Sequence, residues 1–216
     1  SHNVVVGTNA GRYITTGVQN TLIGGLAGDA LTDSDFNTAV GHLALSSDTL
    51  GSRSTAIGMN TLRDQNFTTA TETYNVAIGH GAGLVVTTGV NNTLIGGLAG
   101  DAITTGAANV AVGANALSAV TTTSSSTAVG YNSLAVSTAA NNTAVGRSSL
   151  LANTSGTANV AVGADALAAN TTASNNTAVG FLAGTAVTTG IQNTFLGALA
   201  GDAFTDADKN TAVGTN

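Results

Sequence analysis

The chain has 216 residues, of which only 7% are charged, and its net charge is −6. The acidic balance lacks the basic footprint of nucleic-acid binding proteins, and the absence of cysteine excludes disulfides. No apolar run reaches the roughly 18 residues that a membrane-spanning helix needs.

A five-residue phrase, Asn-Thr-Ala-Val-Gly or a close variant, returns thirteen times along the chain. Ten of the twelve intervals between its glycines are 17 residues long, one is 21 and one is 16. A fixed period predicts one structural unit stacked on itself, with an extended surface in place of a single pocket. We therefore expect one repeat array over residues 1–216, with about twelve coils of 17 residues. A helical fold is excluded because Gly and β-branched residues dominate the repeat.

The phrase itself predicts the strands. With the Asn of each repeat counted as position 1, positions 2 to 4 are β-branched or small, which is typical of a short strand. In chain order, the expected strands are residues 4–6, 21–23, 38–40, 55–57, 76–78, 93–95, 110–112, 127–129, 143–145, 160–162, 177–179, 194–196 and 211–213. The Gly at position 5 predicts a corner with positive φ, and the frequent Gly at position 15 predicts a second corner. Each coil of this all-β, parallel β-solenoid should thus hold two short strands and two turns.

Position 1 predicts a ladder of side-chain amides. Asn occupies it in eleven of the thirteen copies, and Ser54 and Ser126 are the exceptions. Stacked Asn side chains can hydrogen-bond from one coil to the next. The structural ladder is expected at Asn20, Asn37, Asn75, Asn92, Asn109, Asn142, Asn159, Asn176, Asn193 and Asn210.

Position 4 is always Val, Ile or Leu and predicts a buried apolar rank. This rank is expected at Val40, Ile57, Ile78, Ile95, Val112, Val129, Val145, Val162 and Val179. Position 3 is also apolar but points to the opposite face of the strand, so one narrow coil cannot bury both faces. Either a second layer within the coil or association of several chains would cover the remaining face. The simplest association is a homotrimer with these faces at its axis.

Three near copies of a longer phrase lie at residues 17–30, 89–102 and 190–203. They place a large residue at position 3. This indicates either duplication of a larger unit or coils at which a bundle of several chains changes width. The first copy also contains Asp29, and Asp33 and Asp35 follow it. These acids could supply calcium ligands, but the middle copy lacks the second and third acid. We therefore interpret Asp29 as a turn-capping residue.

The 21-residue interval contains four inserted residues, which we expect within residues 64–74. An insertion in a solenoid forms a surface loop, and loops carry binding sites more often than the scaffold does. The segment is either a recognition loop or a neutral insertion on a turn. As a recognition loop, it would act through Arg63, Asp64, Phe67, Glu72 and Tyr74.

The sequence contains no set of residues typical of catalysis. It has three His residues and no recognisable nucleophile–base–acid combination. His42 and His80 stand two coils apart, roughly 10 Å along the stack, which is too far for them to share a metal ion. We expect no enzyme activity, no cofactor and no metal site.

The phrase Asn-Thr-Ala-Val-Gly-x-x-Ala-Leu, carried best by residues 142–150 and 159–167, resembles the β-roll repeats of phage tail fibres. It is also similar to the repeats of trimeric autotransporter adhesin heads, which carry an Ala-Ile-Gly phrase at a shorter period. These families imply a left-handed parallel β-roll, a homotrimer, and a structural or host-attachment role. The longer coil of this chain favours the tail-fibre side of the resemblance.

From this resemblance we expect a non-catalytic fibre segment of a phage tail fibre or a similar trimeric appendage, located in the virion or at a cell surface. The expected partners are further copies of the chain, including a head-to-tail continuation because no polar coil caps either end, and a host receptor or glycan. Nucleic acid and membrane insertion are not expected. Two alternatives stay open: a bacterial adhesin whose rod binds directly, and an ice-binding β-roll, because plant ice-binding proteins repeat Asn-x-Val-x-Gly and position 2 here is only Thr or Val.

Overall fold

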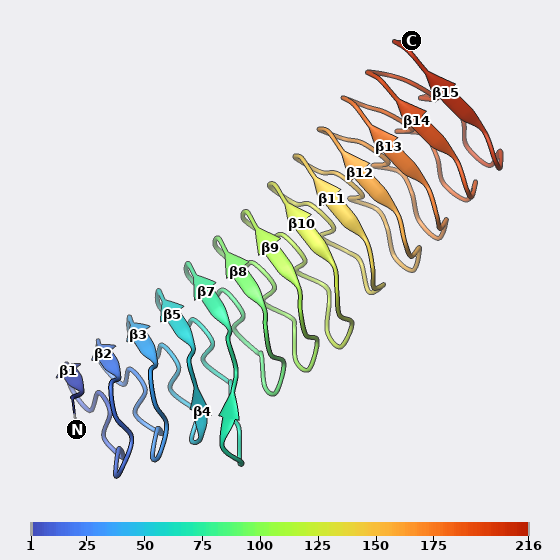
Figure 1. The fold of residues 1–216 in the computed structure, drawn as a ribbon. Coiled ribbons are helices and arrows are strands. Elements are labelled where there is room, and N and C mark those ends of the chain that lie inside the picture. The colour runs from blue at the N-terminus through green and yellow to red at the C-terminus, as the bar shows by residue number, and fades with distance from the viewer. Residues whose placement is uncertain (1, 216) are drawn as a thin grey trace. The chain divides into compact units, whose positions relative to one another are not determined.

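The computed structural model describes residues 2–215, so the two ends of the expected array, Ser1 and Asn216, lie outside the described residues. The chain forms two compact units, Ser1–Asn109 and Val110–Asn216, which are described separately (Figure 1). The first unit contains β1 (Val4–Val6), β2 (Thr21–Ile23), β3 (Thr38–Val40), β4 (Gly51–Ser52), β5 (Thr55–Ile57), β6 (Thr71–Glu72), β7 (Val76–Ile78) and β8 (Thr93–Ile95). The second contains β9 (Val110–Val112), β10 (Thr127–Val129), β11 (Thr143–Val145), β12 (Val160–Val162), β13 (Thr177–Val179), β14 (Thr194–Leu196) and β15 (Thr211–Val213). All thirteen predicted strands are present at the predicted residues.

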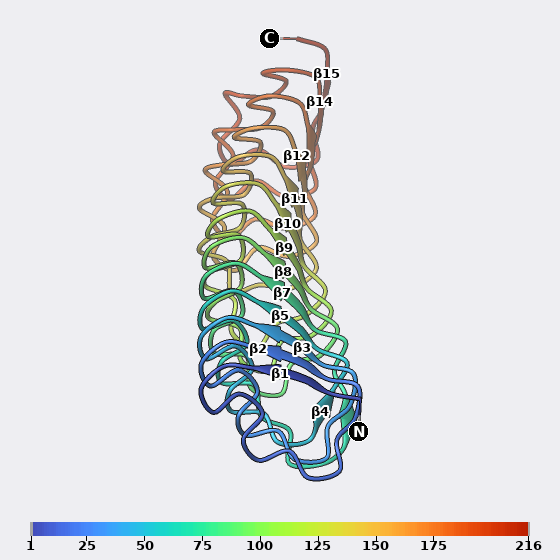
Figure 2. The ribbon, with the colours of Figure 1, turned by 90° about the vertical axis from the view of Figure 1, so that its left-hand side faces the viewer.

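Within each unit, every three-residue strand pairs in parallel with its equivalent one coil later. In β3 and β5, for example, Ala39 pairs with Ala56 and Val40 pairs with Ile57. Each repeat position therefore lies beside its own copy from the next coil. The prediction of an all-β, parallel β-solenoid of about twelve coils is confirmed. Figure 2 shows the strands of each unit along one side of their successive coils.

The prediction of two strands in every coil is wrong. Within residues 2–215, only β4 and β6 form a second ladder, with Gly51 opposite Thr71. In the other described coils no second ladder forms. The return path turns through the left-handed region at positions 7 and 9 and at the last position of every complete repeat, which keeps its extended stretches short. These turns are also present in the coil that contains β4, at Leu43 (φ 57°) and Leu45 (φ 53°), and the second ladder is only two residues long.

The Gly at position 5 is required because successive coils approach closely at this corner. Gly24 has a φ of +134°, and a Cβ atom there would lie 2.5 Å from the carbonyl oxygen of Gly41 in the next coil. All thirteen position-5 glycines have φ between 128° and 142°, which confirms the predicted corner. Gly at position 15 acts differently: Gly17 has no positive φ, but a Cβ there would collide with the backbone of Ser34.

The interior of each coil is filled by position 3, by a small residue at position 8 and by positions 9 and 12. In one coil, Ala39, Ala44 and Leu45 are all fully buried. Six of the twelve coils combine Ala at position 3 with Leu at position 9. Because the space enclosed is narrow, the small side chain of the strand points inward and the larger side chain comes from the return path.

Three coils use the opposite combination. Leu22 occupies position 3, and the position-9 residues of its own coil and the preceding coil are Gly28 and Gly11. A Cβ on either glycine would lie 2.8 Å from the Leu22 side chain. The other two cases are Leu94 with Gly83 and Gly100, and Phe195 with Gly184 and Gly201. The large residues of the near copies therefore exchange volume with glycine inside the coil.

We predict that Gly24→Ala lowers the free energy of unfolding by about 2–4 kcal/mol, because the new Cβ must displace the backbone of the next coil. The adjacent Gly25→Ala is the matched control, since a Cβ there would lie 3.4 Å from the His42 side chain, an ordinary contact. Chemical unfolding of both variants measures the difference. Equal stability of the two variants would contradict a close approach of the coils at this corner.

Candidate functional site

The predicted ladder asparagines lie at the same corner of successive coils within each unit. The backbone N–H of Asn37 donates to Oδ1 of Asn20 at 2.9 Å, and Nδ2 of Asn37 donates to the carbonyl oxygen of Gly51 at 2.9 Å. Asn92 makes the equivalent two bonds to Asn75 and Gly106, and Asn176 makes them to Asn159 and Gly190. The main acceptor contact is thus to a backbone N–H, so the ladder satisfies the buried amide that precedes each strand.

The apolar rank at position 4 lies on the outer face of the sheet and does not fill the coil. Val40 is half-buried and Ile57 is 37% exposed, whereas Ala39 and Ala56 at position 3 are fully buried. Within the chain, the buried rank is therefore position 3. The expected burial of position 4 is corrected: position 3 faces the narrow interior, where it is Ala in most coils and where Leu or Phe fits opposite the position-9 glycines.

The insertion loops out between Phe67 and β6. The N–H of Leu50 donates to the carbonyl oxygen of Phe67, and the N–H of Thr71 donates to the carbonyl oxygen of Leu50. Both hydrogen bonds are made with Leu50 of the preceding coil. Residues 68–70 lie between Phe67 and Thr71 and are exposed. The loop falls inside the predicted range of residues 64–74.

The five residues predicted for the recognition loop do not lie together. Phe67 is buried, with 7% of its surface exposed. Arg63 and Asp64 form an ion pair with each other, with Nε 2.7 Å from Oδ1. Glu72 and Tyr74 bond to one another through the Tyr74 hydroxyl. Of the five, only Glu72 lines the pocket beside the loop, and Tyr74 supports it.

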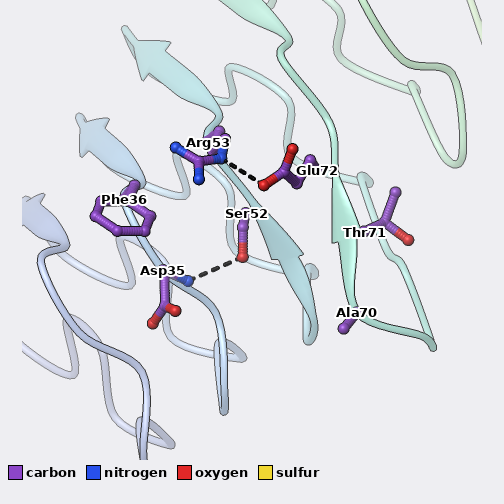
Figure 3. Close-up of a pocket in the computed structure, with 7 residues that line it drawn as sticks. All are labelled: Asp35, Phe36, Ser52, Arg53, Ala70, Thr71 and Glu72. Atoms are coloured by element: carbon purple, nitrogen blue, oxygen red, sulfur yellow. Dashed lines mark hydrogen bonds and ion pairs between the residues drawn. The ribbon is translucent and has the colours of Figure 1, made fainter.

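This pocket has a volume of about 180 Å³ and is built from three successive coils of the first unit (Figure 3). It is lined by Asp35, Phe36, Ser52, Arg53, Ala70, Thr71 and Glu72. Nε of Arg53 donates to Oε1 of Glu72 at 2.9 Å. The guanidinium carbon also lies 4.7 Å from the ring centroid of Phe36 and 5.9 Å from that of Tyr74. Arg53 is thereby held by one carboxylate and two aromatic rings.

Hydrogen bonding sets the charge of the pocket. The Tyr74 hydroxyl, and then the Arg53 guanidinium, donate to Glu72 and lower its pKa below the ordinary value. The same bond raises the pKa of the Tyr74 phenol, and the bond to Glu72 raises that of Arg53. Glu72 is therefore an anion and Arg53 a cation at neutral pH. Oδ1 of Asp35 accepts the N–H of Val18 at 2.7 Å.

Sequence reasoning located Glu72 and Tyr74 but missed the residues that the preceding two coils bring to them. Phe36, Arg53 and Tyr74 all occupy position 17, the last position of three successive repeats. An aromatic–arginine–aromatic series at one repeat position is the signal that could have identified the pocket. Reading the insertion as an isolated loop concealed this column.

A buried hydrogen-bond network holds the start of the insertion. The fully buried Asp48 accepts bonds from Nε2 of Gln65 at 2.6 Å, from the N–H of Phe67 at 3.0 Å and from the N–H of Gly51 at 3.1 Å. Burial raises the pKa of Asp48, and these bonds only partly offset that effect. Gln65 in turn accepts a bond from Nδ2 of Asn75. The missed signal was the polar side chain at position 12, which is apolar in most coils of this unit.

The described residues offer no metal centre. In residues 2–215, no three His, Cys, Asp or Glu side chains come together to hold an ion. Two of the acids considered as calcium ligands have other partners: Asp33 accepts from the Thr16 hydroxyl and Asp35 from the Val18 amide. The pocket presents hydrogen-bonding groups and aromatic surface.

No helix that could cross a membrane occurs in the described part of the chain. Comparisons with protein families, curated proteins and solved structures found no match to the chain.

We predict that Asp48 makes the fold less stable as pH rises. Its pKa in the folded state lies above the ordinary 3.8, so the folded state binds more protons than the unfolded state between these two values. The contribution of Asp48 to stability is greatest below pH 3.8 and declines as pH rises through the folded pKa, by about 1.4 kcal/mol for each pH unit between the two pKa values.

Urea unfolding of the wild type and of Asp48→Asn from pH 3 to pH 7 measures this contribution. Asp48→Asn should remove this part of the pH dependence. Asp33→Asn, which removes an exposed carboxyl one coil earlier, is the control. A wild-type curve that matches Asp48→Asn at every pH would contradict the burial of a titrating carboxyl.

Proposed function

We propose that the chain is a non-catalytic, structural segment of a homotrimeric fibre, of the kind found in phage tail fibres or similar surface appendages, and that it supports attachment to a host. One observation carries the proposal. The outer face of the sheet in each unit is uncharged and partly apolar, although nothing within residues 2–215 fully covers it.

The distribution of charge supports an interface at this face. Position 2 is always Thr or Val, and position 4 is always Val, Ile or Leu. The five basic and eleven acidic residues all lie outside the strands of this face, so none occupies positions 2 to 4 of a repeat. Exposed contiguous apolar surface of this kind marks an interaction site in soluble proteins.

Association of several copies of the same chain is the simplest way to cover this face. A self-complementary face with equal ranks of Thr and Val can meet its own copies about a symmetry axis. Burying the aliphatic ranks contributes roughly 25 cal/mol for each Å² of apolar surface removed from water. Three copies leave the charged corners, the insertion and the pocket facing outward. The left-handed coil and the virion or cell-surface location belong to the same proposal through the resemblance to tail fibres and adhesin heads.

A rod that itself binds the host, as in an adhesin, is the first alternative. It requires the same outward corners and differs in where recognition takes place. The pocket beside the insertion is the feature of the described residues that favours it.

We predict that the wild type is a trimer and that Val145→Asp dissociates it. Val145 lies on the outer face of β11, where a charge is tolerated in a single chain but would be buried without a partner in the assembly. Light scattering at micromolar concentration measures the mass. Thr157→Asp is the matched control, because it adds the same charge at position 16, where Asp35 and Asp208 already occur. A monomeric wild type would contradict the trimer.

Ice binding is the second alternative, and one observation favours it. The Thr hydroxyls at position 2, as in Thr127 and Thr143, lie on the outer face beside the rank of Val residues. Among residues 2–215, these position-2 hydroxyls make no hydrogen bond to the protein. Ranks of Thr and Val would repeat every 4.8 Å or so along the stack and about 6.6 Å across it. Such a flat, regular array could order water.

A single measurement separates ice binding from the trimer, because both use the same face. We predict no thermal hysteresis from the trimeric wild type, since its Thr hydroxyls are covered. Hysteresis from a monomer, lost on Thr143→Lys, would replace the fibre proposal with ice binding.

A further inference from the structure

The pocket between the insertion and the two preceding coils combines aromatic surface with hydrogen-bonding groups that the protein does not fully use. Phe36 is 43% exposed and Tyr74 is 50% exposed. Ser52 Oγ accepts the N–H of Asp35 at 3.0 Å, which leaves its own proton free to donate. Arg53 uses Nε toward Glu72, and Figure 3 shows its terminal nitrogens on the Phe36 side, directed away from Glu72.

The charges of the pocket select against an ionic ligand. Asp35 and Glu72 contribute two carboxylates against the single guanidinium of Arg53, so an anion would meet net negative charge. A cation would compete with Arg53, which is already paired with Glu72. The guanidinium lies over the Phe36 ring but leaves 43% of Phe36 exposed. The groups that remain suit a neutral ligand that both donates and accepts hydrogen bonds and presents a C–H surface to a ring.

Size narrows the ligand further. The volume of about 180 Å³ is well below the roughly 300–1,000 Å³ of sites for drug-sized molecules. One six-membered ring with several hydroxyls matches both this volume and the mixture of aromatic surface and polar groups.

We propose that this pocket binds a single neutral pyranose residue, with its C–H face against Phe36 and its hydroxyls bonded to Asp35, Ser52 and Arg53. This inference deepens the attachment role proposed above and rests on it for its biological setting, but the pocket lies within one chain. The shallow site implies an affinity on the order of millimolar for one sugar. Several copies on one fibre would strengthen attachment by avidity.

The test is a titration of the ¹⁵N-labelled full chain with neutral monosaccharides, read from amide chemical shifts. We expect saturable shifts at Ser52, Arg53 and Thr71 with at least one neutral sugar. Phe36→Ala should weaken binding at least tenfold, and Phe36→Tyr should retain it. Phe36→Ala is compatible with folding, because Ala108 and Ala158 occupy the same repeat position with φ 56°.

Phe181→Ala is the matched control, since Phe181 is 53% exposed and lies in the second unit; it should bind as the wild type does. Sialic acid and inorganic phosphate form the anionic arm, and stronger binding of either would overturn the assignment. Comparison of free sugars with their methyl glycosides separates a free sugar from the end residue of a glycan. No saturable shift with any neutral sugar would also overturn the proposal. The mass of the assembly is measured separately. A trimer that does not bind sugar would therefore overturn the sugar-binding proposal and leave the fibre proposal standing.

Discussion

The close approach of successive coils at the position-5 glycine is the constraint on which the rest of the structure depends. With the backbone of Gly41 only 2.5 Å from the place of a Cβ on Gly24, the coils can stack in only one register. Parallel pairing of each repeat position with its own copy follows from that register. The buried Asn amides then lie where they can accept the backbone N–H of the next coil, so the unpaired groups at the corner are satisfied.

Much of this architecture could be predicted from the sequence because it repeats. A strand at positions 2 to 4, a Gly corner and an Asn ladder each depend on one column of the repeat. The direction in which a strand faces does not, because Ala39 and Val40 are both apolar and only the volume enclosed by the coil decides between them. The course of the return path could not be predicted either: residues such as Leu45 adopt the left-handed conformation and keep its extended stretches short, and Leu carries no sign of that conformation. The pocket was missed because its residues come from different coils.

The structure separates an uncharged sheet face from the charged residues. The three-residue strands carry the uncharged outer face, while the charged residues and most of the aromatic residues lie on the return paths and around the insertion. Asp48 joins these two parts of the first unit, since its buried carboxylate binds the backbone at both Gly51 and Phe67. A loop that would otherwise move freely is thus fixed to the interior of the solenoid, which gives the neighbouring pocket a defined shape.

The exchange of volume between Leu22 and its two flanking glycines has a consequence for how such a chain can change over generations. A coil with a large residue at position 3 cannot be inserted alone between two ordinary coils, because the Leu at position 9 of the coil before it would occupy the same space. Recombination must carry the preceding Gly as well. The near identity of the three copies does extend back to residues 10–30, 82–102 and 183–203, each longer than one period. The segment that must be duplicated as one piece is therefore the end of one coil, from its position-9 glycine onward, together with the coil that follows it.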